Sequence, residues 1–133
     1  MRIACVKKRI LIADYLAHSR ELIRIILESE GYEVVEARDG AEAIAKTREH
    51  LPDLILLDLQ MPIVDGFNVI SILRSDRQFA RIPVVALTAS AMHGDRERAI
   101  EAGFTKYIAK PVPIAVLRAE VANLLQIAAA HDG

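Results

Sequence analysis

The sequence predicts an α/β protein built on a doubly wound parallel sheet, and two features of the chain indicate it. Short apolar runs alternate with longer segments whose apolar residues recur at helical spacing, five times in all. The short runs are continuously apolar rather than alternating, which is typical of strands covered by helices on both faces. The chain has 133 residues, so we expect a single domain over residues 1–133 with its core at about 8–126.

The first half of the chain contains two such strand-helix pairs. Residues 9–13 form a brief apolar run, and residues 19–29 follow with apolar side chains on one side, charges on the other and a glycine after the end. Residues 32–37 are rich in β-forming side chains. After an Asp-Gly turn, residues 41–50 are rich in helix formers until Pro52 stops them.

The second half repeats the pattern three times. Residues 54–57 are a continuous apolar run, and residues 64–75 follow as a predicted helix. Residues 82–87 are again β-branched and apolar, and residues 91–102 form a helix that a glycine ends. The fifth pair is a short strand at 106–109 and a long helix at 113–129.

Four polar residues follow predicted strands and are the first candidates for a functional site. Asp14, Asp58, Thr88 and Lys110 come just after the first, third, fourth and fifth strand. In sheets of this class, ligands bind at the carboxyl ends of the strands, so these side chains are expected to converge. Four apolar residues lead directly into Asp58. Because burying an unpaired carboxylate costs several kcal/mol, we expect Asp58 at a surface or beside a cation.

Composition excludes several other classes of function. Lys and Arg number 17 against 18 Asp and Glu, with no long block of either sign, so neither a nucleic-acid footprint nor a polybasic membrane arm is indicated. No apolar run is long enough for a membrane span, and residues 1–8 lack the apolar region of a signal peptide. The single cysteine, Cys5, cannot form an internal disulfide. We therefore expect a cytoplasmic protein in a reducing compartment.

Taken together, the motifs resemble the receiver domain of two-component response regulators, of the stand-alone, single-domain type. The resemblance covers about residues 8–126, and its combination of motifs in this order is highly specific. It implies a flavodoxin-like sheet in the strand order 2-1-3-4-5. The matching segments are Ile10-Leu11-Ile12-Ala13-Asp14, PDLILLDLQMP at residues 52–62, Asp65-Gly66, Val84-Val85-Ala86-Leu87-Thr88-Ala89 and Lys110-Pro111.

The resemblance also implies a function. Asp58 is expected to take a phosphoryl group from a phosphohistidine on a histidine kinase or a histidine phosphotransfer protein, and the protein then signals by contact with a downstream protein. Such a domain is not an enzyme, although it assists its own phosphorylation and dephosphorylation. The resemblance implies Mg²⁺ as cofactor, held by Asp14, Asp58 and the backbone carbonyl of Gln60, an oxygen set that suits this ion. Lys110 and Thr88 are expected to contact phosphoryl oxygens.

The same residues also have purely structural interpretations. An Asp after a strand, such as Asp58, commonly caps the next helix. Thr88 is open to the same reading, and Lys110 to that of a solvated surface charge. Tyr107 matches the family's switch aromatic, but a half-buried strand aromatic is the ordinary reading of such a residue. By analogy with the family, the Lys110-Pro111 peptide is expected to be cis.

One departure from the family pattern raises an alternative function. Receivers usually carry two adjacent acids after the first strand, the second of which binds the metal directly, whereas this chain reads Asp14-Tyr15. Arg20 and Gly31 keep their usual distances only if Tyr15 occupies the second acidic position. A neutral phenol is a poor Mg²⁺ ligand, so the affinity for metal is expected to fall. The alternative is a degenerate receiver that acts as a phosphorylation-independent interaction module. A third class, a small flavodoxin-like enzyme or cofactor binder, lacks support because no glycine-rich phosphate loop is present.

Overall fold

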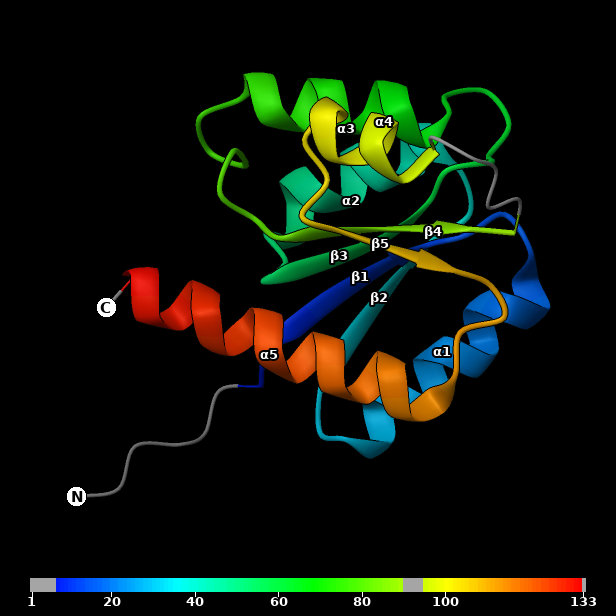
Figure 1. The fold of residues 1–133 in the computed structure, drawn as a ribbon, viewed down its shortest axis with the longest axis vertical. Coiled ribbons are helices and arrows are strands. Elements are labelled where there is room, and N and C mark those ends of the chain that lie inside the picture. The colour runs from blue at the N-terminus through cyan, green and yellow to red at the C-terminus, as the bar shows by residue number, and fades with distance from the viewer. Residues whose placement is uncertain (1–6, 90–94, 133) are drawn as a thin grey trace.

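The computed structural model describes residues 7–89 and 95–132, and these form a five-stranded parallel sheet with helices on both faces (Figure 1). The strand order is β2-β1-β3-β4-β5, as the resemblance to receiver domains implied. The strands are β1 (Arg9–Ala13), β2 (Glu33–Ala37), β3 (Leu54–Asp58), β4 (Val84–Thr88) and β5 (Lys106–Ala109). The helices are α1 (Ala17–Ser29), α2 (Gly40–His50), α3 (Gly66–Ser75), α4 (Asp95–Ala102) and α5 (Ile114–Asp132).

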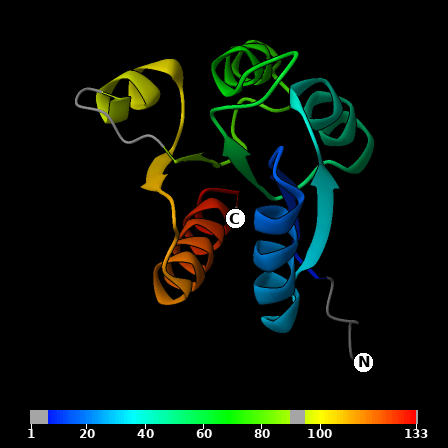
Figure 2. The same ribbon diagram turned by 90° about the vertical axis from the view of Figure 1, so that its right-hand side faces the viewer.

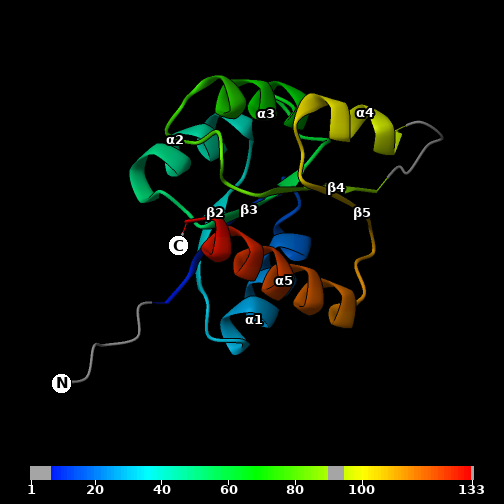
Figure 3. The same cartoon turned by 60° about the vertical axis from the view of Figure 1, so that its left-hand side comes forward.

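The helices divide into two layers. Helices α2, α3 and α4 cover one face of the sheet and α1 and α5 the other (Figures 1 and 3), and Figure 2 shows α1 and α5 side by side. Successive strand residues enter opposite layers, because side chains alternate across a strand. Leu11 packs in the cluster under α2 and α3, whereas its neighbour Ile12 packs in the cluster under α1 and α5. Both faces of the sheet are therefore buried, which explains the continuous apolar runs.

The ends of two helices show how the sequence sets them. Helix α3 begins at Gly66 rather than at residue 64, because the side chain of Asp65 accepts a hydrogen bond from the backbone of Asn68 at 2.9 Å and caps the helix. Asp39 caps α2 in the same way, accepting from Glu42 N at 2.8 Å. Cys5 and the first residues of the predicted helix at 91–102 lie outside the described residues.

Helix α1 carries apolar side chains on more than one side. Ile23, Ile26 and Leu27 are buried under the sheet, but Leu22 is 54% exposed and Ile25 is 52% exposed. The helix therefore keeps apolar side chains on its outer surface as well as on its core face.

Helix α5 is the longest helix and covers the β1, β3 and β4 side of the core. Its buried residues are Leu117, Val121, Leu124 and Leu125. Polar residues between them reach neighbouring elements, as when Glu120 pairs with Lys106 of β5 at 3.3 Å. Within residues 7–89 and 95–132, no helix combines the length and the apolar character needed to cross a membrane.

Candidate functional site

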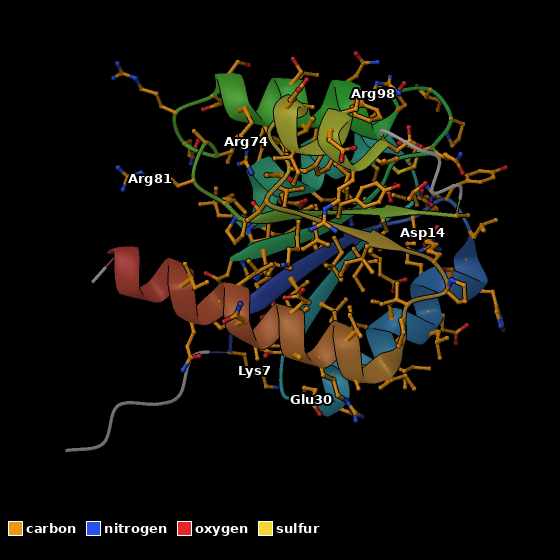
Figure 4. The ribbon with its side chains drawn as sticks, in the orientation of Figure 1. Lys7, Asp14, Glu30, Arg74, Arg81 and Arg98 are labelled. Atoms are coloured by element: carbon orange, nitrogen blue, oxygen red, sulfur yellow. The ribbon has the colours of Figure 1, made fainter. Side chains whose placement is uncertain are left out.

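The carboxyl edge of the sheet brings together the residues that the sequence singled out. Asp58 and Thr88 are the last residues of β3 and β4, while Asp14 and Lys110 follow the last residues of β1 and β5. The strand register places Asp58 beside Leu87, the residue before Thr88. The backbone N–H of Lys110 donates to the carbonyl of Thr88 at 2.7 Å and joins the ends of β4 and β5. In Figure 4, Asp14 is labelled at this edge, beyond the end of β1.

A single ammonium group links two carboxylates at this edge. Lys110 Nζ lies 2.7 Å from Asp14 Oδ2 and 3.0 Å from Asp58 Oδ2. Asp14 is fully buried, Asp58 is 5% exposed, and the Lys110 side chain is 12% exposed. Buried carboxylates are tolerated when a cation and hydrogen bonds compensate them. Lys110 supplies that cation, so it is not the solvated surface charge of the structural interpretation.

The second oxygen of each carboxylate accepts a backbone hydrogen bond from two residues further on. Asp14 Oδ1 accepts from Leu16 N, and Asp58 Oδ1 accepts from Gln60 N, both at 2.9 Å. These local bonds orient both side chains toward Lys110. Asp58 does not cap α3, because Asp65 occupies that position. Each carboxylate is thus held by a backbone N–H donor of its own and by the Lys110 ammonium, which the two carboxylates share.

The two carboxyl groups differ in pKa because they are compensated unequally. Burial raises the pKa of Asp14, but hydrogen bonds from Lys110, Leu16 and Ser19 outweigh it and leave that pKa below its usual value. Burial raises the pKa of Asp58, and the bonds from Gln60 and Lys110 offset this only in part. Burial lowers the pKa of Lys110, but its two carboxylate partners reverse the sign and raise it. Asp14 is therefore the better-stabilised anion of the pair.

Arg20 supports this site. In the sequence, its position served only to align the chain with the family pattern. Its Nη1 donates to the backbone carbonyl of Asp14 at 2.7 Å, and its Nε donates to Glu36 at 2.9 Å. The guanidinium therefore ties the turn after β1 to β2. The sequence shows an Arg six residues after the acid, but its partner on β2 depends on strand pairing.

Gly66 brings the start of α3 close to the backbone at the end of β3, the strand that ends in Asp58. A Cβ at this position would lie 2.8 Å from the carbonyl oxygen of Asp58 and 2.8 Å from Leu59 Cα. Only glycine permits this approach without a shift of the chain. The Asp65-Gly66 pair thus sets both the start of α3 and its distance from Asp58.

The remaining predicted residues occupy the surroundings of the acid pair. Thr88 is buried at the end of β4, and Gln60 is exposed in the loop after β3. Tyr107 is half-buried in β5 and packs against the core under α3 and α4. Its hydroxyl is buried and finds no hydrogen-bond partner among the described residues. Burial, with the charges of Asp95 and Glu97, raises the pKa of that hydroxyl. As expected, the Lys110-Pro111 peptide is cis.

The oxygen donors at this edge suit Mg²⁺ in kind but are few. Asp14 and Asp58 supply carboxylates, and hard oxygen ligands are what this ion prefers. The residue after Asp14 is Tyr15, whose side chain is 58% exposed. In the described part of the chain, no group of three or more His, Cys, Asp or Glu side chains is placed to hold a metal. The pocket therefore fits the ion through two carboxylates rather than three.

An apolar groove of about 440 Å³ lies beside Lys110. It runs between α1 and the segment that leads into α5. Among its lining residues, Ile23, Ile26 and Leu117 are buried, and Ser19 and Lys110 carry polar side chains. The exposed side chains of Leu16, Leu22 and Ile114 border it. The groove therefore adjoins the candidate site through Lys110, whereas Asp14, Asp58 and Thr88 do not line it.

Comparisons with known proteins agree with this architecture. The sequence model of the response regulator receiver domain matches residues 10–122. A curated relative, the polar-differentiation response regulator DivK of Brucella ovis, is 42% identical over 107 residues, which are 80% of this chain and 87% of the relative.

Solved structures give the same result. A CheY-like receiver domain protein from Methanospirillum hungatei superposes with a TM-score of 0.88 at 28% identity, over 95% of this chain and 99% of that one. The receiver domain of a Pseudomonas aeruginosa sensor histidine kinase, with magnesium in its active-site cleft, superposes with a TM-score of 0.84 at 31% identity, over 91% and 99%. The chain therefore belongs to the response regulator receiver domain family, the signalling domains of two-component systems.

Proposed function

We propose that this protein is a phosphoacceptor receiver whose Asp58 takes a phosphoryl group from a phosphohistidine on a histidine kinase or a histidine phosphotransfer protein. The observation that carries the proposal is the fixed orientation of the Asp58 carboxylate. One oxygen accepts from Gln60 N and the other from Lys110 Nζ, so the group is held at the carboxyl edge of the sheet. A nucleophile of this kind needs positioning more than covalent assistance, because phosphoryl transfer depends mainly on alignment and charge neutralisation.

The proposed reaction uses the side chains at this edge. An Asp58 oxygen attacks the phosphorus in line with the bond to the donor imidazole, the new O–P bond forms, and the N–P bond breaks with its electron pair left on the imidazole nitrogen. Lys110 turns from the carboxylates toward the phosphoryl oxygens, and the hydroxyl of Thr88 donates to another of them. The product is an aspartyl phosphate, and no further reactant is needed.

Asp14, Asp58 and the backbone carbonyl of Gln60 are the residues that would hold Mg²⁺. When bound, that ion would neutralise negative charge on the transferring phosphoryl group. The magnesium in the cleft of the related Pseudomonas aeruginosa receiver supports this choice of ion. The residues of this chain orient the carboxylates and keep Asp14 ionised through its lowered pKa.

The donor protein is proposed to dock on the groove between α1 and the start of α5. Asp58 is 5% exposed, so a phosphohistidine reaches it only if the surrounding rim contacts the donor protein. Leu16, Leu22 and Ile114 are exposed on that rim and suit an apolar helix face. The partner is thus expected to carry its histidine on a helix with apolar neighbours.

The assignment of Asp58 is tested by intact-mass measurement. The wild-type protein and Asp58→Asn are incubated with a small phosphodonor and Mg²⁺. A phosphate adduct is expected on the wild type only, and an adduct that persists in Asp58→Asn would reject Asp58 as the acceptor. Asp53→Asn is the matched control. Asp53 lies at the opposite end of β3, where its carboxylate accepts a hydrogen bond from Arg9 N at 2.8 Å. This variant is expected to form the phosphate adduct as the wild type does.

A second proposal concerns the response to phosphorylation. An added phosphate draws Thr88 toward itself and changes the packing of Tyr107, whose buried hydroxyl lacks a partner among the described residues. Amide NMR spectra with and without a phosphoryl mimic test this. Shifts are expected in α4 and β5, and changes confined to the surroundings of Asp58 would reject Tyr107 as a switch residue.

The degenerate receiver is the second candidate function, and Tyr15 is the observation that favours it. A phenol that is 58% exposed stands where the family carries an acid that binds metal directly. Under this proposal the protein binds its target without modification. Equal affinity of wild type and Asp58→Asn for the same partner, together with no phosphate adduct on the wild type, would select the degenerate function.

A further inference from the structure

The loop between β3 and α3 contains a strained turn. Ile63 has a φ of 71°, and Val64 N donates to Pro62 O at 2.8 Å, which is the hydrogen bond of a γ-turn with positive φ at its central residue. Such turns are rare, and a β-branched side chain fits them poorly because it crowds the backbone at positive φ. The Ile63 side chain is 82% exposed, so its own packing does not compensate the strain. Contacts of its neighbours must therefore hold the turn.

Buried side chains lie on both sides of this turn. Met61 belongs to the core under α2 and α3, and Val64 packs against the same core. The chain leaves the core after Met61 and returns at Val64, so only Pro62 and Ile63 are available to reverse its direction. Because the ring of Pro62 fixes its φ at a negative value, the positive φ falls on Ile63.

The first residue of α2 supports the turn from outside the loop. Gly40 is buried, and a Cβ at this position would overlap the carbonyl oxygen of Val64 and lie 2.7 Å from its carbonyl carbon. No side chain fits into that space unless the loop or the helix moves. Asp39 caps this end of α2 by accepting from Glu42 N at 2.8 Å, which keeps the first turn of the helix in place. The start of α2 therefore limits how far Val64 can move.

The same loop carries a hydrogen-bond donor of the candidate site. Gln60 N donates to Asp58 Oδ1 at 2.9 Å, three residues before Ile63. Gly66 N donates to Leu59 O at 3.2 Å and closes the loop at its base. A closed loop of this length has few residues that could absorb a change at its tip. Relaxation of the turn at Ile63 would therefore displace Gln60.

We propose that Gly40 is a positioning residue for Asp58, an inference that rests on the proposed function of Asp58 as phosphoacceptor. By lying against Val64, Gly40 holds the turn at Ile63, and the held turn keeps the N–H of Gln60 on the Asp58 carboxylate. A strained segment persists only where its surroundings over-determine it, and such segments cluster at functional sites. The strain at Ile63 thus accompanies a nucleophile that is fixed before the reaction.

Urea unfolding of Ile63→Gly and Ile63→Ala tests the strain. At ordinary φ the alanine variant is the more stable of the two, because glycine has more freedom in the unfolded chain. At positive φ the order is reversed, since a Cβ crowds the backbone there. We expect the unfolding equilibrium constant of Ile63→Gly to be about fivefold or more smaller than that of Ile63→Ala. An alanine variant that is equally stable or more stable would overturn the inference.

Gly40→Ala tests the positioning role, with phosphoramidate and Mg²⁺ as reagents. Phosphoramidate is a small donor that needs no docking surface, so its rate of transfer reports on the nucleophile itself. In the folded variant the rate should fall by about tenfold or more, because a misplaced reacting group loses alignment. The amide NMR signal of Gln60 should shift as well. A rate or a Gln60 signal that stays as in the wild type would leave Gly40 with a packing role only and overturn the inference.

Gly31→Ala is the matched control for this substitution. Gly31 lies between α1 and β2, has a φ of 93°, and has no atom within 4 Å of the place where a Cβ would stand. The variant should lose stability through its backbone conformation alone. We expect it to keep the phosphorylation rate and the Gln60 signal of the wild type. A loss of rate equal to that of Gly40→Ala would make the effect one of stability and overturn the inference.

The double variant Gly40→Ala/Ile63→Gly tests the coupling, and it also serves if Gly40→Ala alone does not fold. Without a Cβ at position 63 the turn needs no support from α2. Adding Gly40→Ala to Ile63→Gly should therefore slow phosphorylation by less than about threefold. A slowing of about tenfold in this background, or a double variant that does not fold, would overturn the inference.

The outcomes distinguish this inference from the proposed function. If the wild-type protein takes no phosphate from phosphoramidate, the proposed function fails. The Gln60 signal and the order of the two Ile63 variants then still test whether Gly40 holds the loop. If the wild type is phosphorylated on Asp58 and Gly40→Ala reacts at the same rate, the inference fails alone.

Discussion

Removing the Lys110 ammonium should destabilise the fold strongly at neutral pH, and Lys110→Met tests this. At 2.7 and 3.0 Å, each ion pair is worth about 6 kcal/mol of attraction at an effective dielectric near 20. Desolvation of the three buried groups, at several kcal/mol per ion, offsets much of this sum. In the variant, two carboxylates remain buried without the cation that compensates their charge. We expect a loss of about 3–5 kcal/mol in the free energy of unfolding.

The stability of Lys110→Met should depend on pH, and the direction follows from the pKa values of the two carboxyl groups. Without Lys110, burial and mutual repulsion raise the pKa of both Asp14 and Asp58 in the folded state above the unfolded value. Between the unfolded-state pKa and the raised folded-state pKa of these carboxyl groups, the folded state then binds more protons than the unfolded state. The stability of the variant therefore increases as the pH falls through that range. The deficit of Lys110→Met should therefore shrink between about pH 7 and pH 4.5. For the same reason, Lys110→Met combined with Asp58→Asn should recover much of the loss at pH 7.

Urea unfolding followed by far-UV circular dichroism, in EDTA, is the assay. The matched control is Lys106→Met, because Lys106 pairs with Glu120 at 3.3 Å and both side chains are partly exposed. That variant should lose no more than about 1 kcal/mol, with little dependence on pH. If Lys110→Met behaves like Lys106→Met, or if its deficit does not shrink at low pH, the two carboxylates are not held by charge and the reasoning about the pocket fails.

Three further predictions concern the packing of the helices and strands. Gly66→Ala should lower the melting temperature by several degrees, because the new Cβ would meet the Asp58 carbonyl at 2.8 Å, and an unchanged melt would mean that α3 shifts freely. The partly buried guanidinium of Arg74 donates to the carbonyls of Phe79, Ala80, Ile82 and Gly103. Arg74→Leu should therefore cost about 2–4 kcal/mol in urea unfolding, and a loss below about 1 kcal/mol would contradict this role. Tyr107→Phe should keep or raise stability, by up to about 1 kcal/mol, and a clear loss would reveal a partner for the hydroxyl.

Figure 4 shows Arg74 and Arg98 in the helical layer that carries α3 and α4. Arg98 lies over the ring of Phe67 at 4.3 Å, and Phe67 meets Phe104 edge to face at 6.1 Å between ring centres. Arg74 reaches the carbonyl of Gly103 just after α4. These contacts fasten α4 to α3 at several points, so a signal that moves α4 must act against them.

The sequence alone determined the order of elements, the class of sheet and the edge at which the site lies. Apolar runs and helical spacing are local properties, and they remain visible without knowledge of the fold. The strand order followed from the resemblance. Because parallel strands all end at one edge, the positions of Asp14, Asp58 and Lys110 after their strands were enough to predict that they converge. The structure brings these three side chains into direct contact.

The tertiary structure alone decided how these groups pair. Lys110 bridges two carboxylates that are 96 and 52 residues away in the sequence, and this pairing was not predicted from the sequence. The bond from Arg20 to the Asp14 carbonyl was likewise outside the reach of local patterns. Each depends on the distance and angle at which one element packs on another, and hydrophobic periodicity does not carry that information. Local patterning identifies the residues at the edge of the sheet, and packing between distant segments selects the partner of each charge.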